Sequence, residues 1–356
     1  MSLEHPEHIC LPHDLSEFDE IIDVRSPGEF ADDHLPEARN LPVLSNIQRS
    51  EVGSLYKKNP FEARRLGARY VSESIAGHLA GPLRRVPPGW NPLLYCWRGG
   101  QRSSSFASVL RSIGWRARTL EGGYKAYRRF VMEDLDRRLS RPDLQFRIIS
   151  GLTGVGKTRL LHMLKDEGGQ IVDLEHLASH RGSLLGAQGS QPTQRLFESR
   201  LHKALSTLDP ARPVFTEAES NRIGSVYLPS ALWRKFSESG VVELTLPIPE
   251  RVKLLLEDYA HFPRVPDTLA SLVDQLRKLR GNDRVEQWHT SISEGRWTEF
   301  VTSLLENHYD LCYRRPGSPN SNYQAPAEKL PLPDCSAMAF REVAIRLLEP
   351  QAARPE

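Results

Sequence analysis

The sequence lacks the features that would assign it to a special structural class. Its 356 residues include only four cysteines, Cys10, Cys96, Cys312 and Cys335, which lie far apart and form no C-x-x-C pair. This spacing argues against a disulfide framework and against a structural zinc site. No apolar run approaches the roughly 18 residues that a membrane helix needs, and the N-terminus is acidic where a signal peptide would be basic. We therefore expect a cytoplasmic protein without membrane contact.

An excess of charge of one sign is also missing. The 47 Lys and Arg residues nearly balance the 45 Asp and Glu residues and leave a formal net charge of +2, so the chain as a whole does not indicate nucleic-acid binding. Residues 102–129, however, hold seven basic residues and one acid, with Trp115, Tyr124 and Tyr127 among them. Such a stretch is typical either of a solvated helix face or of a surface that binds RNA phosphates and stacks bases.

The length and the alternation of elements predict two α/β domains. At roughly 100–200 residues per domain the chain holds about two, and strand-like runs alternate with helical stretches in both halves. This order favours mostly parallel sheets covered by helices. We expect a first domain over residues 1–130, a connecting helix over 131–144 and a second domain over 145–356 that ends in helices. The expected strands are Ile21–Val24, Leu93–Cys96, Gln145–Ser150, Gln170–Leu174, Pro213–Glu217 and Val241–Leu246, and Arg315–Pro333 is expected to be a polar, proline-rich connection.

Cys96 stands at the end of one of these strands and is followed by glycines and arginines at the start of a helix. Backbone N–H groups at such a turn converge on an anion, and the helix dipole, Arg98 and Arg102 add positive charge. The same field favours a thiolate over a thiol. The pattern therefore predicts that Cys96 is a nucleophile able to carry sulfur or selenium as a persulfide-type anion, against the alternative of a buried structural cysteine.

Two stretches of the first domain resemble the rhodanese family of sulfurtransferases. One is DVRSPGEF followed by DHLPEARNLP, within residues 23–42, and the other is the Cys96 loop. The resemblance covers about residues 14–130 and implies a rhodanese-like fold with Cys96 as the catalytic chalcogen carrier. The residues expected to support its loop are Asp23, Arg25, Trp97, Arg98, Gly99, Gly100 and Arg102. Glu37 replaces a frequent Gly, and the C-x-x-x-x-x-R loop is one residue longer than usual, which suits selenium or, in a phosphatase, phosphate.

Residues 151–158, GLTGVGKT, match the phosphate-binding pattern G-x-x-x-x-G-K-[S/T] in full. The glycines let backbone N–H groups surround phosphate oxygens, Lys157 neutralises them, and Thr158 can bind magnesium. We expect phosphate contacts from Gly151, Thr153, Gly154, Val155, Gly156, Lys157 and Thr158. The expected magnesium ligands are Thr158, Glu217 and Asp173, with Glu219 and Glu175 as alternatives, and each acid can equally be a helix cap or a salt-bridge partner. The motif predicts a diphosphate or triphosphate ligand.

The order of the two loops resembles the tRNA 2-selenouridine synthase family, in which a rhodanese domain precedes a P-loop domain. LEGGYKAYR at 120–128, DLEHLA at 173–178 and EAESNRIG at 217–224 extend this resemblance over about residues 14–315. It implies a selenotransferase that replaces sulfur by selenium at the wobble 2-thiouridine of tRNAs for Lys, Glu and Gln. Selenophosphate would donate the selenium, which makes a selenophosphate-producing enzyme a further expected partner, and geranyl diphosphate would alkylate the sulfur first.

This family resemblance implies a division of work between the loops. A thiocarbonyl sulfur leaves poorly, whereas its S-alkylated form leaves as a neutral thiol, so alkylation lowers the barrier to selenium attack. The P-loop would hold the diphosphate, with magnesium and without ATP hydrolysis, while Cys96 would deliver or relay selenium. The expected tRNA surface consists of Arg116, Arg118, Lys125, Arg128 and Arg129.

Three other functions use the same two loops. An ATP-dependent tRNA sulfurtransferase would activate the uridine oxygen on the P-loop and supply sulfur from a Cys96 persulfide. A regulatory rhodanese module attached to a P-loop sensor would form no product at Cys96. A phosphatase, suggested by the longer cysteine loop, would release phosphate from an aryl phosphate. The ligand of the P-loop, prenyl diphosphate or nucleotide, separates the first of these from the selenotransferase.

Overall fold

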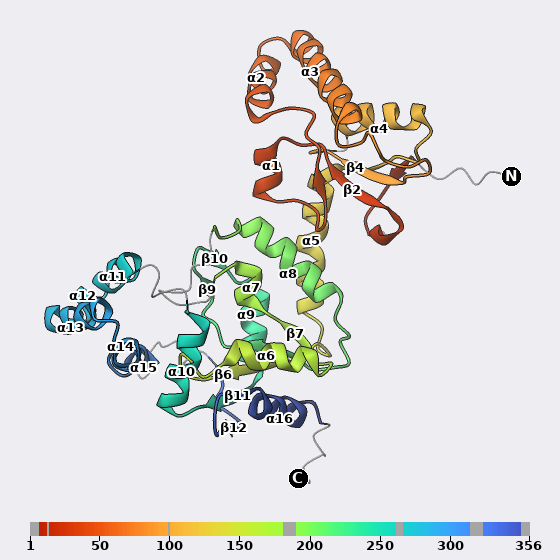
Figure 1. Ribbon diagram of the computed structural model, residues 1–356. Helices are drawn as coiled ribbons and strands as arrows, with labels where there is room; N and C mark the ends of the chain where they lie inside the picture. The colour runs from red at the N-terminus through yellow and green to blue at the C-terminus, as the bar shows by residue number, and fades with distance from the viewer. Residues whose placement is uncertain are drawn as a thin grey trace. The chain divides into compact units, whose positions relative to one another are not determined.

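The structure is a computed structural model with two compact units. It describes residues 7–12, 14–98, 100–180, 190–260, 266–313 and 323–349. The first unit comprises Met1–Arg137 with Pro192–Lys203, and the second comprises Arg138–Gln191 with Ala204–Glu356. Each unit contains a five-stranded parallel sheet with helices packed on it (Figure 1), which confirms the predicted α/β class. Among the described residues no helix combines the length and the apolar character needed to cross a membrane.

The sheet of the first unit has the strand order β1-β5-β4-β2-β3, with all neighbouring strands parallel. Ile22 and Leu94 face each other across two inner strands and belong to the unit's core. Both are fully buried, as expected where helices cover the two faces of a parallel sheet. The strands are β1 (His8–Ile9), β2 (Glu20–Asp23), β3 (Arg39–Asn40), β4 (Pro92–Tyr95) and β5 (Arg118–Leu120).

Helices begin and end in the first unit where the sequence supplies caps. Ser26 and Glu29 form a capping box in front of Pro27, and Gly114 ends the helix after the cysteine loop with a left-handed φ of 108°. The helix that the sequence predicts directly after the Cys96 loop is thereby confirmed. The helices are α1 (Pro27–Asp32), α2 (Asn46–Tyr56), α3 (Pro60–Ala80), α4 (Gln101–Ile113) and α5 (Gly123–Leu139), with a short 3-10 turn at Leu15–Glu17.

The predicted domain boundaries differ from the division into units. α5 belongs to the first unit up to Arg137 and is not a separate connector. Residues 192–203, in helix α8 (Gln194–Ser206) and just before it, also belong to the first unit, although the sequence places them within the second domain. His202 Nε2 lies 2.8 Å from Asp134 Oδ2, and Lys203 pairs with Glu37 at 3.3 Å. These long-range polar contacts have no signature in the local sequence.

The second unit has the strand order β12-β11-β6-β8-β7, again with all neighbours parallel. β6 lies in the middle and leads directly into the predicted P-loop. β12 falls within the stretch expected to be a polar connection, because its sequence EKLP has one large apolar residue, Leu330, which is buried. The strands are β6 (Phe146–Ser150), β7 (Gln170–Val172), β8 (Val214–Glu217), β11 (Gly240–Thr245) and β12 (Glu328–Pro331), and β9 (Arg222–Ile223) and β10 (Val226–Tyr227) form a separate hairpin.

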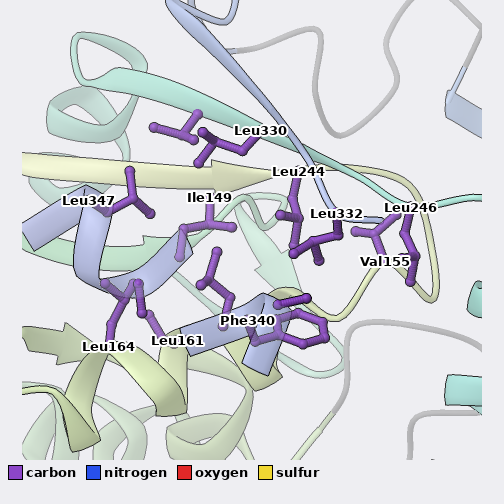
Figure 2. Close-up of a cluster of buried hydrophobic side chains, with 14 of the residues drawn as sticks. Ile149, Val155, Leu161, Leu164, Leu244, Leu246, Leu330, Leu332, Phe340 and Leu347 are labelled. Atoms are coloured by element: carbon purple, nitrogen blue, oxygen red, sulfur yellow. The ribbon is translucent and has the colours of Figure 1, made fainter. Parts of the chain in front are cut away.

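Two helices pack together against one face of this sheet. Figure 2 shows Ile149, Leu244 and Leu330 from three strands together with Leu161 and Phe340 from α6 and α16. The C-terminal helix is therefore part of the core around the P-loop. The helices that pack around this sheet are α6 (Lys157–Asp166), α7 (Leu174–Ala178), α9 (Ser230–Ser237), α10 (Ile248–Asp258) and α16 (Ala337–Leu348).

A group of helices follows α10, in agreement with the prediction that the second domain ends in helices. Its own apolar cluster includes Trp288, Val285 and Phe300, all almost fully buried. α10 packs against α14, which connects this helical group to the sheet. The helices are α11 (Pro266–Asp274), α12 (Arg277–Arg280), α13 (Asn282–Ser293), α14 (Trp297–Leu304), a π-helical turn (Leu305–Tyr309) and α15 (Asp310–Tyr313).

Candidate active site

Cys96 lies directly after β4, at the loop that begins α4. Its side chain is only 3% exposed, and Sγ accepts hydrogen bonds from the backbone N of Gly100 and from Ser103 Oγ, both at 3.3 Å. Both donors belong to the beginning of α4, where the helix dipole also favours a negative charge. The sulfur therefore occupies an anion-binding position. The sequence analysis missed Ser103, which is recognisable only by its place in the first turn of the helix.

The electrostatics of this loop favour the thiolate. Burial raises the pKa of Cys96, but hydrogen bonds from Ser103, the charge of Arg102 and the backbone N–H of Arg98 lower it by more. The pKa of the thiol consequently lies below its ordinary value. More of the sulfur is then in the nucleophilic form at neutral pH than in an ordinary cysteine.

Asp23 and Arg25 form a buried ion pair beneath the loop. Arg25 Nη2 lies 2.6 Å from Asp23 Oδ2, and both side chains are at most 1% exposed. The guanidinium stacks 4.0 Å from the ring centroid of Tyr124, whose backbone N donates to Cys96 O at 2.8 Å. The pair thus supports the loop through Tyr124, without a hydrogen bond to the sulfur.

The other predicted support residues divide into paired and exposed groups. Arg102 donates to Glu29 at 3.2 Å, and Arg49 pairs with the same carboxylate at 2.8 Å. Trp97 packs on Tyr124 with 5.2 Å between ring centroids, and Arg98 is exposed. Gly99 lies outside the described residues. Arg98 is therefore the arginine of this loop that presents its charge most directly to an incoming anion.

The expected tRNA surface needs correction. Arg118 is 9% exposed and pairs with Glu17 at 3.0 Å, while Arg128 is 19% exposed and pairs with Glu198 of α8. Tyr124 and Tyr127 are each 3% exposed, so neither offers a face on which a base could stack. These side chains serve the packing of the unit because α8, distant in sequence, covers this part of α5. The residues of the surface that remain exposed are Arg116, Lys125 and Arg129.

The P-loop of the second unit follows β6 and closes around glycines with left-handed backbone. Gly151 has φ 145°, and a Cβ there would lie 2.5 Å from Leu244 O. Gly156 has φ 83°, and a Cβ there would lie 2.4 Å from Phe340 Cζ. No other residue type fits either position without displacing the sheet or α16. The loop conformation that exposes backbone N–H groups is thus fixed by tertiary packing.

The chemically active side chains of the P-loop point to one place. Lys157 Nζ donates to Gly151 O at 3.1 Å, and Thr158 Oγ1 donates to Glu217 Oε2 at 3.0 Å. Lys157, Thr158 and Glu217 line a cavity of about 480 Å³ together with Thr153, Gly154 and Gly156, whereas Gly151 and Val155 are not part of its lining. Most of the predicted phosphate-binding residues therefore surround a space large enough for a small phosphorylated ligand.

Arg251 of α10 holds the loop from its other side. Its Nε donates to Thr153 O at 2.9 Å, while Nη1 and Nη2 donate to the two carboxylate oxygens of Asp310 at 3.0 and 2.6 Å. Both side chains are buried, and paired hydrogen bonds of this kind fix the orientation of a guanidinium. The sequence analysis missed this pair because its members lie about 100 and 160 residues after the loop.

Three carboxylates face Thr158 across the cavity. Glu175, Glu217 and Glu219 bring one oxygen each to within 4.8 Å of one another. Burial and then the neighbouring carboxylates raise the pKa of Glu217 well above its usual range, and burial and Glu175 raise the pKa of Glu219 to about 8. Glu217 Oε1 is buried without a hydrogen-bond partner among the described residues. The set fits a hard divalent cation, which oxygen ligands bind and whose charge relieves the repulsion.

Asp173 is not part of this carboxylate set. Its Oδ1 accepts from the backbone N of His176 at 2.8 Å and caps α7, and its Oδ2 lies 2.8 Å from His162 Nε2. Asp173, one of the expected magnesium ligands, therefore lies outside the group of carboxylates near Thr158, which consists of Glu175, Glu217 and Glu219. A helix begins directly after β7, and its N-terminus engages the first carboxylate that follows the strand.

Comparisons with known proteins match both units. The family described as "Rhodanese-like domain" matches residues 12–130, and that described as "tRNA 2-selenouridine synthase AAA domain" matches residues 144–293. The tRNA 2-selenouridine synthases of Marinobacter nauticus and Hydrogenovibrio crunogenus are each 34% identical to this chain, over 81% and 82% of it and over 83% and 88% of their own lengths. That of Nitrosomonas europaea is 38% identical over 67% of this chain and 63% of its own length. The chain therefore belongs to the tRNA 2-selenouridine synthase family of enzymes.

Proposed function

We propose that the chain replaces sulfur by selenium in the wobble 2-thiouridine of tRNAs for Lys, Glu and Gln, with selenophosphate as the selenium donor. Family membership supports selenouridine synthesis in tRNA in general. The observation that carries the finer proposal is the presence, on one chain, of a thiol with a lowered pKa and a complete phosphate cradle. Neither feature alone distinguishes selenium transfer from ordinary sulfur transfer or nucleotide hydrolysis.

In the first step the uridine sulfur attacks C1 of geranyl diphosphate. The S–C bond forms, the C–O bond to the diphosphate breaks, and the diphosphate leaves with its negative charge. Backbone N–H groups of the P-loop and Lys157 would stabilise that charge where it develops. ATP has no part in this step, and the P-loop serves a leaving group.

In the second step selenium enters at the pyrimidine carbon as a nucleophile. The C–Se bond forms, the C–S bond breaks, and geranyl thiol leaves after taking up a proton. Selenium enters at the selenide level, so the exchange at this carbon needs no oxidant. Cys96 would release this selenium from selenophosphate: its thiolate, held by the donors of the loop, attacks phosphorus, the S–P bond forms and the P–Se bond breaks. The selenide then attacks the pyrimidine carbon, and water hydrolyses the S–P bond to release phosphate.

Magnesium fits the carboxylate set of the second unit and would assist the first step. Thr158, Glu175, Glu217 and Glu219 would hold it, and the unpartnered Glu217 Oε1 supplies the reason to expect a cation. Bound there, the ion would supply Lewis-acid stabilisation of the departing diphosphate. Lys157 and the loop backbone would keep the phosphates oriented while the alkyl group transfers.

The decisive experiment follows the nucleoside products of a 2-thiouridine-containing tRNA by mass spectrometry. With geranyl diphosphate alone we expect S-geranyl-2-thiouridine, and with selenophosphate added we expect 2-selenouridine, in both cases without ATP. A tRNA with unmodified uridine serves as the control and should remain unchanged. ATP-dependent incorporation of sulfur into that control, without alkylation, would instead identify an ATP-dependent tRNA sulfurtransferase.

A further inference from the structure

A second cavity adjoins the P-loop cavity in the second unit. It has a volume of about 580 Å³ and shares Thr153, Leu255 and Tyr259 with the wall of the P-loop cavity. α10 supplies Leu255 and Leu256, and α14 supplies Phe300 and Val301 on the opposite side. These three residues line both cavities, so the second cavity lies directly next to the phosphate-binding loop.

The two cavities differ sharply in chemistry. The P-loop cavity is lined by Lys157, Thr158 and the carboxylates, whereas the second one is lined mainly by carbon. The charged residues of its wall, Arg296 and Glu299, pair with each other at 2.6 Å. A nucleoside fits this lining poorly, because its base and ribose need polar partners, whereas a hydrocarbon chain needs none.

We infer that this apolar cavity binds the hydrocarbon tail of the prenyl diphosphate whose phosphates lie on the P-loop, an inference that rests on the function proposed above. The phosphates of this substrate would lie among polar and charged side chains, and its hydrocarbon tail would lie among apolar ones. The volume lies within the range of about 300–1,000 Å³ that is typical of small-molecule sites. The wall formed by α14 then limits the length of the tail.

Val301 is the residue best placed to test this wall. It is half-buried and lines the apolar cavity, but it does not line the P-loop cavity. Phe300 and Leu304 are almost fully buried in the helical core, so changes there risk the fold. Val301→Trp introduces a large ring into the tail site while leaving the phosphate-binding residues intact.

The test measures binding of a non-reactive thiolo analogue of geranyl diphosphate and, separately, of inorganic diphosphate, by calorimetry on the full chain. Each buried methylene changes affinity about fourfold, so displacing two or three carbons weakens binding about 15- to 60-fold. We expect this loss for Val301→Trp with the geranyl analogue and less than a twofold change with inorganic diphosphate. Ser293→Trp, at an exposed position of α13 outside the cavity, is the matched control and should change neither affinity. Equal affinity of Val301→Trp and the wild type for the geranyl analogue would overturn the inference.

A second variant covers the case in which Val301→Trp fails to fold. Val301→Ala widens the cavity, and we expect the affinity for a farnesyl analogue to rise at least threefold relative to the geranyl one. An unchanged ratio in a folded Val301→Ala protein would also contradict a tail site at α14.

Lys157→Ala separates the failure of this inference from failure of the proposed function. Lys157→Ala can abolish binding of the geranyl analogue while both Val301 variants bind it as the wild type does. In that case the phosphate site on the P-loop is supported, and the tail site in the apolar cavity is wrong. If the wild type binds no geranyl analogue at all, the proposed use of a prenyl diphosphate fails together with the tail site.

Discussion

The cysteine loop and the P-loop share one backbone plan and differ in what faces it. In each unit a buried inner strand, β4 or β6, ends in a loop from which a helix begins, α4 or α6. In the first unit the helix start hydrogen-bonds to a sulfur that belongs to the loop itself. In the second unit the loop surrounds an open cavity, and three carboxylates stand across from it.

This difference shows how one anion-binding geometry serves two kinds of chemistry. Where the anion is the protein's own thiolate, the helix start lowers its pKa and creates a nucleophile. Where the cavity is open and carboxylates line it, the loop fits a phosphorylated ligand together with a cation. In the proposed function the first loop would activate an attacking group, and the second one would stabilise a leaving group.

Removing the sulfur should produce the largest effect and separates the two loops. Cys96→Ser keeps the size of the side chain but replaces a thiolate by a hydroxyl that stays protonated. We expect formation of 2-selenouridine to fall by on the order of 10³-fold, while geranylation continues and the S-geranyl nucleoside accumulates. Mass spectrometry of the tRNA nucleosides measures both. Normal formation of 2-selenouridine by this variant would contradict the role proposed for the first loop, because selenation would then not need the Cys96 thiolate.

Lys157→Ala is the corresponding test of the second loop. The loss of one positive charge next to the departing diphosphate should slow geranylation by on the order of 10²-fold. A tRNA that already carries S-geranyl-2-thiouridine should still be selenated at close to the wild-type rate. Lys165→Ala, exposed in the last turn of α6 and outside the lining of the P-loop cavity, provides the control for a charge removed from the same helix. If Lys157→Ala slows selenation of the geranylated tRNA as much as it slows selenation of the non-geranylated tRNA, both loops act in a single step.

Ser103→Ala tests the source of the thiolate in the first loop. The Ser103 hydrogen bond lowers the pKa of Cys96, so its removal raises that pKa, and less thiolate is present at pH 7. Alkylation of Cys96 by iodoacetamide should slow about three- to tenfold at pH 7, with its midpoint moved to higher pH and equal rates above both pKa values. Ser105→Ala, exposed on the same helix, should leave the profile unchanged. An unaltered profile for Ser103→Ala would assign the lowered pKa to the helix start and Arg102 alone.

Both loops could be predicted from the sequence because their chemistry is local. Cys96 and Lys157 stand in short runs that combine a strand end, glycines and a helix start, and the structure places them accordingly. The residues that complete the sites are distant in sequence. Arg251 and Asp310 fix Thr153 from later helices, and no local pattern marks such a pair. The alternation of strands and helices likewise predicts the two sheets, but not that residues 192–203 pack in the first unit.

The basic stretch of residues 102–129 shows why a run of charged residues predicts a binding surface less well than a loop motif predicts a site. Arg118 stacks on Phe18 and pairs with Glu17, and Arg128 pairs with Glu198, so two of the five charges of the expected tRNA surface are used inside the unit. The length of a run of basic residues does not reveal which of them pair with acidic residues from other parts of the chain. Of the residues expected to contact tRNA, Arg116, Lys125 and Arg129 are exposed.

The smallest expected effect concerns this remaining surface of the first unit. We propose that Lys125 and Arg129, exposed on α5 beyond the cysteine loop, contact tRNA phosphates. Replacing both by Ala should weaken tRNA binding about three- to tenfold and reduce the slope of log affinity against log salt by about 1.4–1.8, since each lost phosphate contact contributes about 0.7–0.9. Arg84→Ala with Arg85→Ala removes the same charge from another exposed site and should leave the slope unchanged. If both double variants lower the slope equally, the net charge of the chain explains tRNA binding. The exposed residues of α5 would then form no dedicated tRNA-binding surface.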